Sequence, residues 1–345
     1  EEIEFKGNQV FSENKLQRKM KETKERNFFR FWKPSKFRPE LYEEDKVAVI
    51  NAYRKEGYRD ASIISDTVYK TEPDRLAVEI EIDEGDQYYF GDIDWVGNTK
   101  YDEEELQRAL KIKKGDVYNE ILLNKRLSTA EDALANLYLD HGYLFYQCNP
   151  VETDIHEDTV ELEMRIYEGK QANLREITIS GNEKTNEHVI RRELRTRPGQ
   201  LFSRSDIVRS VRELAQLGFF DPENIVPTPE PDPQNGTVDL NYAVQERSND
   251  QIEVSGGWGA GMIIGSIGLR LTNLSLRNFF NKEAWNPIPT GDGETLSLRA
   301  RSNGRRYQSY SLSLTEPWVG GKRPNSLSFS LYHTLQTNGL PIDNP

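Results

Sequence analysis

Apolar and polar residues alternate through a short phrase that occurs three times along the chain. It reads Ile3–Asn8, then Ile93–Asn98, then Ile177–Asn182, and each copy ends in Gly-Asn. Alternation of this kind is typical of a strand with one buried face. Gly and Asn both tolerate the left-handed backbone that a tight exit from a strand needs. The copies lie 90 and 84 residues apart, a period too long for a solenoid unit and typical of a small domain used repeatedly.

The first repeat is predicted to follow the order β-α-α-β-β. Its expected elements are a strand at Ile3–Lys6, a helix from Ser12 to about Glu25, a helix from Pro39 to Gly57, and strands at Ala61–Lys70 and Leu76–Asp83 joined by a turn at Pro73-Asp74. In the second helix, Val47, Ile50 and Tyr53 follow one another at spacings of three, so we expect them to form its core face.

The second and third repeats reproduce this order with clearer signals. Asp102 and Glu105 form a capping box at the start of a helix. The second helix of each repeat is expected to run unbroken to a glycine, Gly142 or Gly218. Its apolar positions are Leu123, Leu127, Ala130, Leu134 and Leu137 in the second repeat, and Ile207, Val211, Leu214 and Leu217 in the third. The closing strands alternate through Val160, Leu162, Met164 and Ile166, and through Val238, Leu240, Tyr242 and Val244.

These patterns predict three domains, at 1–85, 86–169 and 170–248. We expect each to fold as a separate three-stranded sheet covered by two helices. Glu84-Gly85 and Glu168-Gly169 each lie only a few residues before the next opening strand. Linkers this short predict a semi-rigid string of domains.

One insertion, Asn27–Pro39, interrupts the first repeat. It interleaves aromatic residues with Lys and Arg: Phe28, Phe29, Phe31, Trp32 and Phe37 with Arg30, Lys33, Lys36 and Arg38. Two interpretations are open. The segment docks a partner or faces a membrane, or its aromatic rings fold back over the small core and leave the cations in water.

The pattern of apolar residues changes after about residue 248, where the helical period disappears and apolar residues occur at every second position. Ile252 and Val254 begin this pattern, and Leu327, Phe329 and Leu331 end it. The strands have one apolar face and one face rich in Ser, Thr and Arg. In a soluble sandwich the apolar face would meet another sheet, whereas in an outer-membrane barrel it would meet lipid. Residues 249–345 therefore form a fourth predicted region.

Charge and apolar content narrow the choice of function. The net charge of −12 comes from the first 250 residues, because the remainder has more Lys and Arg than Asp and Glu. An acidic chain without a basic stripe argues against nucleic-acid binding. The single Cys148 is interpreted as a small buried apolar residue. No run of 18 apolar residues and no secretory signal occur, so we expect no spanning helix and a chain that begins at an internal cut.

Residues for catalysis or cofactor binding are not found in a recognisable arrangement. The four histidines, His141, His156, His188 and His333, lack metal-ligand spacing, and no phosphate-binding glycine loop follows a strand. We therefore predict no catalytic, metal or cofactor residues and no enzyme activity.

Three β-α-α-β-β domains leading into alternating strands resemble the polypeptide-transport-associated (POTRA) modules and barrel start of the BamA family of outer-membrane protein assembly factors. The resemblance covers nearly the whole chain. Its specific parts are the three Gly-Asn phrases, Glu43–Lys46 with Gly57–Ala61, Arg191–Arg195, Leu217–Phe220 and Thr315–Trp318. It implies an α+β protein: tandem POTRA domains, similar to the last three of BamA, followed by the antiparallel strands of an incomplete transmembrane β-barrel.

The chain departs from that family in three places. About five strands are predicted after residue 252, fewer than the eight or so that close a barrel, so we expect the rest to be supplied elsewhere. The span Ser275–Gly293, with Trp285, is longer than a connection between two such strands needs. Pro198 stands where the family often has an acidic residue, which weakens a transfer of lipoprotein-docking residues.

The resemblance implies a protein of the bacterial outer membrane with its POTRA domains in the periplasm. Its implied partners are unfolded outer-membrane β-barrel clients, lipoprotein accessory subunits and outer-membrane lipid, with no cofactor. Two other functions stay open: a related secretion or translocation pore, and a passive scaffold that binds lipoproteins.

Two sets of site residues follow. We predict that the first strand after the repeats templates an incoming client strand along Ile252, Val254, Gly256, Gly257 and Trp258. Its glycines are open to two interpretations that do not exclude one another: a weakly packed seam, or a tight hairpin turn. The second predicted set docks a lipoprotein partner through the guanidiniums of Arg191, Arg192, Arg195 and Arg197, and its alternative is an ordinary solvated helix face.

Overall fold

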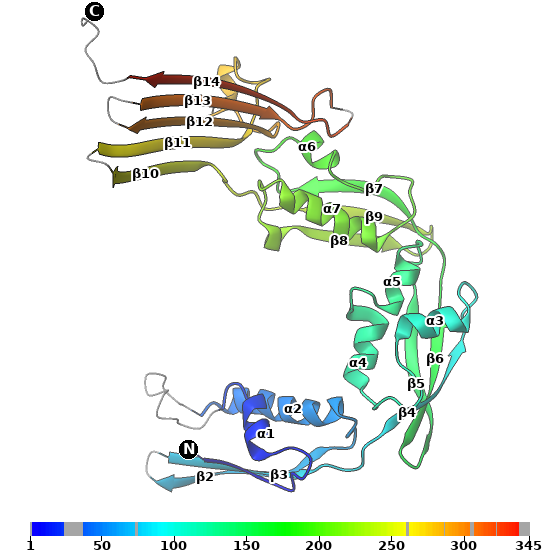
Figure 1. The fold of residues 1–345 in the computed structure, drawn as a ribbon. Coiled ribbons are helices and arrows are strands. Elements are labelled where there is room, and N and C mark those ends of the chain that lie inside the picture. The colour runs from blue at the N-terminus through cyan, green and yellow to red at the C-terminus, as the bar shows by residue number, and fades with distance from the viewer. Residues whose placement is uncertain are drawn as a thin grey trace, which may run out of the picture. The chain divides into compact units, whose positions relative to one another are not determined.

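In the computed structural model, the residues that the structure describes form four separate β-sheets, three of them accompanied by helices (Figure 1). Its contacts divide the chain into two units, Glu1–Lys170 and Gln171–Pro345. The residues that the structure describes are 2–23, 37–72, 75–259, 262–285, 287–303, 307–321 and 323–337.

Each repeat builds its sheet in the same way, with the last strand in the middle and the opening strand parallel to it. The first repeat contains β1 (Glu2–Lys6), α1 (Glu13–Lys19), α2 (Pro39–Lys55), β2 (Ser62–Glu72) and β3 (Arg75–Asp83). The second contains β4 (Tyr89–Val96), α3 (Glu103–Leu110), α4 (Glu120–Asn124), a π-helical turn η2 (Lys125–Thr129), α5 (Leu134–Leu139), β5 (Gln147–His156) and β6 (Thr159–Tyr167). The third contains β7 (Asn173–Ser180), α6 (Glu187–Arg191), α7 (Arg204–Gln216), β8 (Val226–Asp232) and β9 (Thr237–Ala243). The predicted β-α-α-β-β order and the three separate sheets are confirmed.

The Gly-Asn phrase makes the same corner in all three repeats. Gly7, Gly97 and Gly181 have φ between 80° and 89°. A Cβ on any of them would overlap a backbone carbonyl oxygen of the middle strand, so only glycine fits. The asparagine side chain then donates to a carbonyl oxygen three residues later: Asn8 to Phe11, Asn98 to Tyr101 and Asn182 to Thr185.

A glutamate at the end of each middle strand braces this corner. Its carboxylate accepts hydrogen bonds from two consecutive backbone N–H groups: Glu84 from Gln9 and Val10, Glu168 from Thr99 and Lys100, and Glu246 from Lys184 and Thr185. These charge-assisted bonds tie the beginning of each repeat to its end. Glu246 closes the third repeat five residues before the next strand begins.

The predicted core face of α2 is wrong in part. Val47 is 59% exposed and Ile50 is half-buried, while Tyr53 is buried as expected. The residues that face the core are Tyr42, Asp45, Val49, Ala52 and Tyr53. They follow a helical period, but a buried carboxylate stands in the middle of it, and an apolar pattern does not count a carboxylate.

Asp45 also explains why α1 ends at Lys19 and not near Glu25. Its buried carboxylate accepts backbone hydrogen bonds from Lys21 at 2.7 Å and from Thr23 at 2.6 Å. These N–H groups cannot also continue the helix, so the chain turns away after Met20.

The long helix predicted for the second repeat is broken. It divides into α4, the π-helical turn η2 and α5, with an extended backbone at Ala130 and Ala133. Asn136 donates its side-chain amide to the carbonyl oxygens of Ala130 and Glu131, which replaces helical hydrogen bonds there. Four of the five apolar positions are nonetheless buried, and Leu137 is half-buried. The pattern thus predicted burial but not continuity.

The third repeat follows its prediction more closely. Ile207 and Leu214 on α7 are buried, Val211 and Leu217 are half-buried, and the middle strand β9 buries Val238, Leu240 and Tyr242 completely. Most of the insertion 27–39 lies outside the described residues. Phe37 is described; its ring lies 5.3 Å from that of Tyr42 and packs against the first core.

The C-terminal sheet is antiparallel, and its five strands follow the order of the sequence. They are β10 (Gln251–Gly259), β11 (Met262–Leu274), β12 (Glu294–Asn303), β13 (Tyr307–Glu316) and β14 (Leu327–Gln336). The predicted fold class, POTRA-like repeats followed by antiparallel strands, is confirmed. Of the predicted turn at Asn303-Gly304, only Asn303 is described.

Candidate functional site: the free edge and faces of the C-terminal sheet

The strand predicted to receive a client, β10, lies at one edge of the C-terminal sheet (Figure 1). It pairs with β11 along its whole length, from Gln251 opposite Arg270 to Gly259 opposite Met262. Its apolar side chains are highly exposed: Ile252 by 74%, Val254 by 77% and Trp258 by 83%. This strand therefore combines a sheet edge with an uncovered apolar face.

Gly256 and Gly257 lie inside β10 and not in its hairpin turn. Gly256 is opposite Gly265 and Gly257 is opposite Ile264. A Cβ on Gly256 would approach no atom closer than 3.9 Å, and one on Gly257 would meet nothing within 4 Å. Neither glycine has a positive φ. Space and backbone conformation therefore do not require glycine here, and its effect is to leave this part of the strand without side-chain packing.

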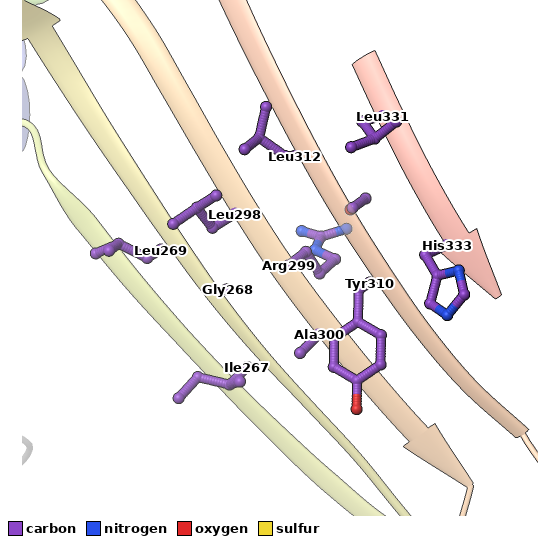
Figure 2. Close-up of a pocket in the computed structure, with 11 residues that line it drawn as sticks. Ile267, Gly268, Leu269, Leu298, Arg299, Ala300, Tyr310, Leu312, Leu331 and His333 are labelled. Atoms are coloured by element: carbon purple, nitrogen blue, oxygen red, sulfur yellow. The ribbon is translucent and has the colours of Figure 1, made fainter. Parts of the chain in front are cut away.

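One face of the sheet is mainly apolar, and two rows of residues on this face cross all five strands. One row is Ile252, Leu269, Leu298, Leu312 and Leu331; the other is Val254, Ile267, Ala300, Tyr310 and His333. Figure 2 shows Leu269, Leu298, Leu312 and Leu331 following one another across four neighbouring strands. These four leucines line a shallow hollow of about 400 Å³, together with Ile267, Ala300, Tyr310 and His333 of the second row. One face of the sheet is thus mainly apolar from β10 to β14, and Ile252, Val254, Ile267 and Leu331 on it are each more than half exposed.

The opposite face is polar and links β10 to β12. Glu253, Gly268 and Arg299 stand side by side in register on three strands. Because Gly268 has no side chain, Arg299 reaches over it and contacts the Glu253 carboxylate at 2.6 Å. Hydroxyl pairs continue this face, among them Ser255 with Ser266 and Ser313 with Ser330. The two faces of the sheet are therefore suited to very different surroundings.

A polar junction, which the sequence did not predict, joins the end of this sheet to the third repeat. Asn273 donates to Thr185 Oγ1 at 2.8 Å, and Asn186 donates to Asp292 at 2.8 Å. Trp318 Nε1 donates to Glu193 at 2.7 Å, so the β13–β14 loop also takes part. These residues are far apart in sequence and carry no shared motif. Only the unusual length of 275–293 gave a signal.

The four predicted docking arginines do not form one free surface. Arg191 pairs with Glu187, and Arg195 forks onto Glu213 with three N···O distances of 2.7–2.9 Å. Arg197 is exposed.

Arg192 belongs to the junction instead. Its guanidinium lies over the ring of Trp318 at 5.4 Å, and its side chain is only 11% exposed. Burial lowers its pKa from the ordinary value, while the nearby carboxylates of Glu193 and Glu316 act in the opposite direction. Partner docking on this surface stays a prediction.

A second hollow, of about 720 Å³, lies beside β4, an edge strand of the second repeat. Gly91, Ile93 and Trp95 line it from the strand, and Glu104 and Gln107 line it from α3. Its rim also carries Arg108, Lys111, Lys113 and Lys114. This arrangement is a groove alongside a sheet edge.

The described part of the chain holds no cluster of His, Cys, Asp and Glu arranged to bind a metal ion. Among these same residues, no helix has the length and apolar character needed to cross a membrane.

Residues 1–85, 88–169 and 172–247 each match the POTRA family, described as a surface antigen variable number repeat. These three segments make up most of the chain, so the chain belongs to the POTRA family. Relatives that are named as assembly factors make the class more specific. It is 31% identical over 338 residues to the putative outer membrane protein assembly factor of Treponema pallidum (strain Nichols), covering 96% of this chain and 38% of that protein.

A second relative is the outer membrane protein assembly factor BamA of Neisseria meningitidis serogroup B. It is 29% identical over 324 residues, which cover 92% of this chain and 38% of the relative. The expected resemblance to the BamA family is thus confirmed. The chain spans about two fifths of the length of these two curated relatives.

Solved structures show the same fold. The POTRA3–5 fragment of Haemophilus influenzae BamA matches with a TM-score of 0.56 and 23% identity, covering 71% of this chain and 95% of that one. BamA of Haemophilus ducreyi lacking POTRA domains 1–3 matches with a TM-score of 0.57 and 24% identity, covering 74% and 44%.

Proposed function

We propose that this chain is part of an outer-membrane protein assembly factor that receives unfolded β-barrel clients and templates their strands on β10. The observation that carries the proposal is the position of β10. It is the first strand after the third POTRA repeat, it lies at the edge of its sheet, and it exposes Ile252, Val254 and Trp258. The relatives named as assembly factors support the same function.

Strand addition needs no catalytic group. An edge strand offers backbone N–H and C=O groups that can pair with another chain. In lipid these groups find no water, so each hydrogen bond formed with a client replaces a costly unsatisfied group. The apolar face of the sheet is suited to lipid and its Ser- and Arg-rich face to a wet interior, as in the wall of an outer-membrane barrel. Gly256 and Gly257 have no side chains, so little side-chain packing is lost there when β10 exchanges one partner strand for another.

The repeats provide earlier contacts for the client. In the second repeat, Ile93 and Trp95 line the groove on the part of the edge strand β4 that follows its pairing with residues 115–117. An extended, unfolded segment can add to such an edge through main-chain hydrogen bonds, with little dependence on its sequence. This is the property that a receptor for many different clients needs.

The location and further partners follow from the same proposal. The sheet would lie in the bacterial outer membrane, in contact with its lipid, and the POTRA repeats in the periplasm. Lipoprotein accessory subunits would dock on the third repeat. Charge reversal at Arg195 and Arg197 tests this docking without disturbing Arg192, which contacts Trp318. Unchanged co-purification of the lipoproteins would contradict it.

Cysteine crosslinking tests strand templating. Single cysteines are placed at each position from 252 to 257 in a Cys148→Ser background, in vesicles supplied with an unfolded β-barrel client that carries a cysteine in its last strand. We expect crosslinks at alternate positions, because strand side chains alternate between faces. Leu298→Cys and Ala300→Cys, in the same rows but on the central strand β12, are the matched controls.

Equal crosslinking at β10 and β12 would contradict templating at the edge.

In a protein of the relatives' full length, a disulfide joining β10 to the last barrel strand should slow client assembly. An unchanged rate would exclude seam opening as the mechanism. Assembly in proteoliposomes also separates insertion of a client from its release across the bilayer, which would indicate a translocation pore.

A further inference from the structure

The connection between β11 and β12 carries an exposed aromatic cluster that strand templating does not use. Phe280 is 93% exposed, Phe279 44% and Trp285 46%. The ring of Phe279 lies 5.5 Å from each of the other two ring centroids. We call residues 276–285 the aromatic loop.

The shape of the aromatic loop is held by hydrogen bonds, so the exposed rings are a built feature. Trp285 Nε1 donates to the carbonyl oxygen of Phe279 at 3.0 Å, and Phe279 N donates to that of Leu276 at 3.1 Å. The Asn281 side chain accepts from Glu283 N at the short helical turn that follows. With its indole N–H satisfied internally, Trp285 can enter a less polar environment without losing a hydrogen bond.

The base of the aromatic loop is fixed to the rest of its unit. Ser275 N donates to the carbonyl oxygen of Pro289, and Gly291 N donates to that of Asn273. Ser275 Oγ in turn donates to Asp292, whose carboxylate accepts from Asn186 of the third repeat. The loop therefore has a defined place at the end of the sheet that carries the third repeat.

This place coincides with the end of the apolar face. Leu271 and Leu296 pair with each other on β11 and β12. Beyond the register shift that follows them, the only apolar residue on these two strands before the connection begins is Leu274, which is buried. If the face meets hydrocarbon, the residues that follow lie at the level of the lipid headgroups. Aromatic side chains are enriched at that level in membrane proteins, because they have an apolar body and a polar edge.

The charges around the rings also fit a phospholipid surface. Arg277 and Lys282 are exposed beside the aromatic residues, against a single acidic residue, Glu283. Cations flanking exposed aromatic rings are suited to lipid phosphates, and they strengthen binding to anionic bilayers. We propose that the aromatic loop inserts into the headgroup region of the phospholipid bilayer next to the third repeat, and so sets the depth of the sheet; this rests on the proposed function.

Depth measurement tests the proposal. In the Cys148→Ser background, a fluorophore sensitive to polarity is attached to Phe280→Cys in the loop, Val254→Cys on the sheet face, or Val226→Cys in the third repeat. The chain is reconstituted in phosphatidylethanolamine–phosphatidylglycerol vesicles that contain quenchers at headgroup or at mid-chain level. We expect the Phe280 label to shift to the blue and to be quenched mainly at headgroup level. The Val254 label should be quenched at mid-chain level and the Val226 label by neither.

The outcomes separate the two proposals. A Val254 label in the hydrocarbon with a Phe280 label in water overturns the aromatic loop inference and leaves the proposed function intact. A Phe280 label at the headgroups with a Val254 label in water keeps the loop–lipid contact and overturns insertion of the sheet. Protection of the Phe280 label that needs added protein, or that rises with chain concentration, would assign the loop to a protein partner or a second copy and overturn the inference.

Two variants sharpen the test. Phe279→Ser with Phe280→Ser should move a label at Trp285→Cys toward water. The partition of the labelled loop into the bilayer should fall at least about tenfold, since burying even one phenylalanine is worth about a factor of ten in a partition equilibrium. Arg277→Gln with Lys282→Gln should leave the label at the headgroups in neutral vesicles but remove the response to phosphatidylglycerol. If the response to phosphatidylglycerol persists unchanged, Arg277 and Lys282 do not contribute to binding of the anionic lipid.

Discussion

The middle strand of the third repeat and the last strand of the C-terminal sheet have the same two-residue alternation and opposite surroundings. On β9, Val238 and Leu240 are at most 1% exposed, because α6 and α7 complete a core over their sheet. On β14, Phe329 and Leu331 are about 60% exposed. Alternation therefore defines which face of a strand is apolar, and the neighbouring elements decide what that face meets. Only the repeats carry a helical period next to their strands.

A buried charge should break this comparison most strongly. Leu240→Lys places an ammonium in the core of the third repeat, so we expect that repeat to lose about 4 kcal/mol or more and to unfold in part. Leu331→Lys, its matched partner on the exposed face, should leave urea unfolding of the repeats unchanged. In vesicles it should weaken insertion of the sheet by about 2 kcal/mol. Circular dichroism measures the unfolding and vesicle flotation measures the insertion. Equal loss of helix in both variants would contradict the difference in surroundings between β9 and β14.

The glycines provide a second matched pair. In Gly181→Ala the new methyl group overlaps the carbonyl oxygen of Val244 at a φ of 88°, so we expect a loss of about 2–4 kcal/mol. In Gly256→Ala the new methyl group makes only an ordinary contact, 3.9 Å from the carbonyl oxygen of Ile264, and its effect on unfolding should stay within about 0.5 kcal/mol. Urea denaturation gives both values. A large loss in Gly256→Ala would show that this stretch of β10 is tightly packed.

Glu168 should give a smaller, pH-dependent effect confined to the repeats. Burial alone would raise its pKa, but hydrogen bonds from Thr99, Lys100 and Tyr138 outweigh burial and hold the pKa below the ordinary value of 4.5. A depressed pKa stabilises the fold fully above pH 4.5, and this stabilisation is lost as the pH falls through the folded value.

We therefore expect Glu168→Gln to cost about 1–2 kcal/mol at pH 7 and progressively less in acid. Urea midpoints measured from pH 7 to pH 3 test it, with Glu157→Gln, at an exposed position in the turn between β5 and β6 of the same repeat, as the control. If the difference in stability between Glu168→Gln and the native chain does not shrink in acid, the ionised carboxylate of Glu168 does not stabilise the repeat as proposed.

The Glu253–Arg299 pair should have the smallest effect. Both side chains are more than half exposed, so a double-mutant cycle with Glu253→Gln and Arg299→Gln should give a coupling of about 0.5 kcal/mol or less in detergent. Gly268→Val should abolish that coupling, because its side chain would occupy the space between the partners. Coupling that survives Gly268→Val would mean that the ion pair does not depend on the space left by the missing side chain of Gly268.

Much of the fold could be predicted because the same pattern of residues occurs in each of the three repeats. The corner glycines, the helix stops and the alternating middle strands are local signals, and local signals survive without knowledge of contacts. The errors arose where a polar side chain bonds to backbone groups that a helix would otherwise use. Asp45 ends α1 and interrupts the apolar stripe of α2, and Asn136 replaces helical hydrogen bonds in the second repeat.

The candidate site was predictable in position but not in surroundings. The order of the strands was enough to make β10 an edge, because adjacent antiparallel strands usually pair in sequence. The fate of Arg192 could not be predicted, since its partner Trp318 is more than a hundred residues away. The junction formed by Thr185, Asn273 and Asp292 likewise depends on tertiary contacts that leave no periodic trace.

The parallel pairing of the first and last strands in each repeat has a mechanical consequence. The chain enters a repeat at the start of β1, β4 or β7 and leaves it near the end of the adjacent β3, β6 or β9. Tension along the chain therefore slides the two strands past each other, which loads all the hydrogen bonds of the ladder at once. Peeling apart an antiparallel hairpin breaks them one at a time and needs less force. Each POTRA repeat is thus built to resist being pulled open along the direction in which its neighbours, or an attached client, would pull.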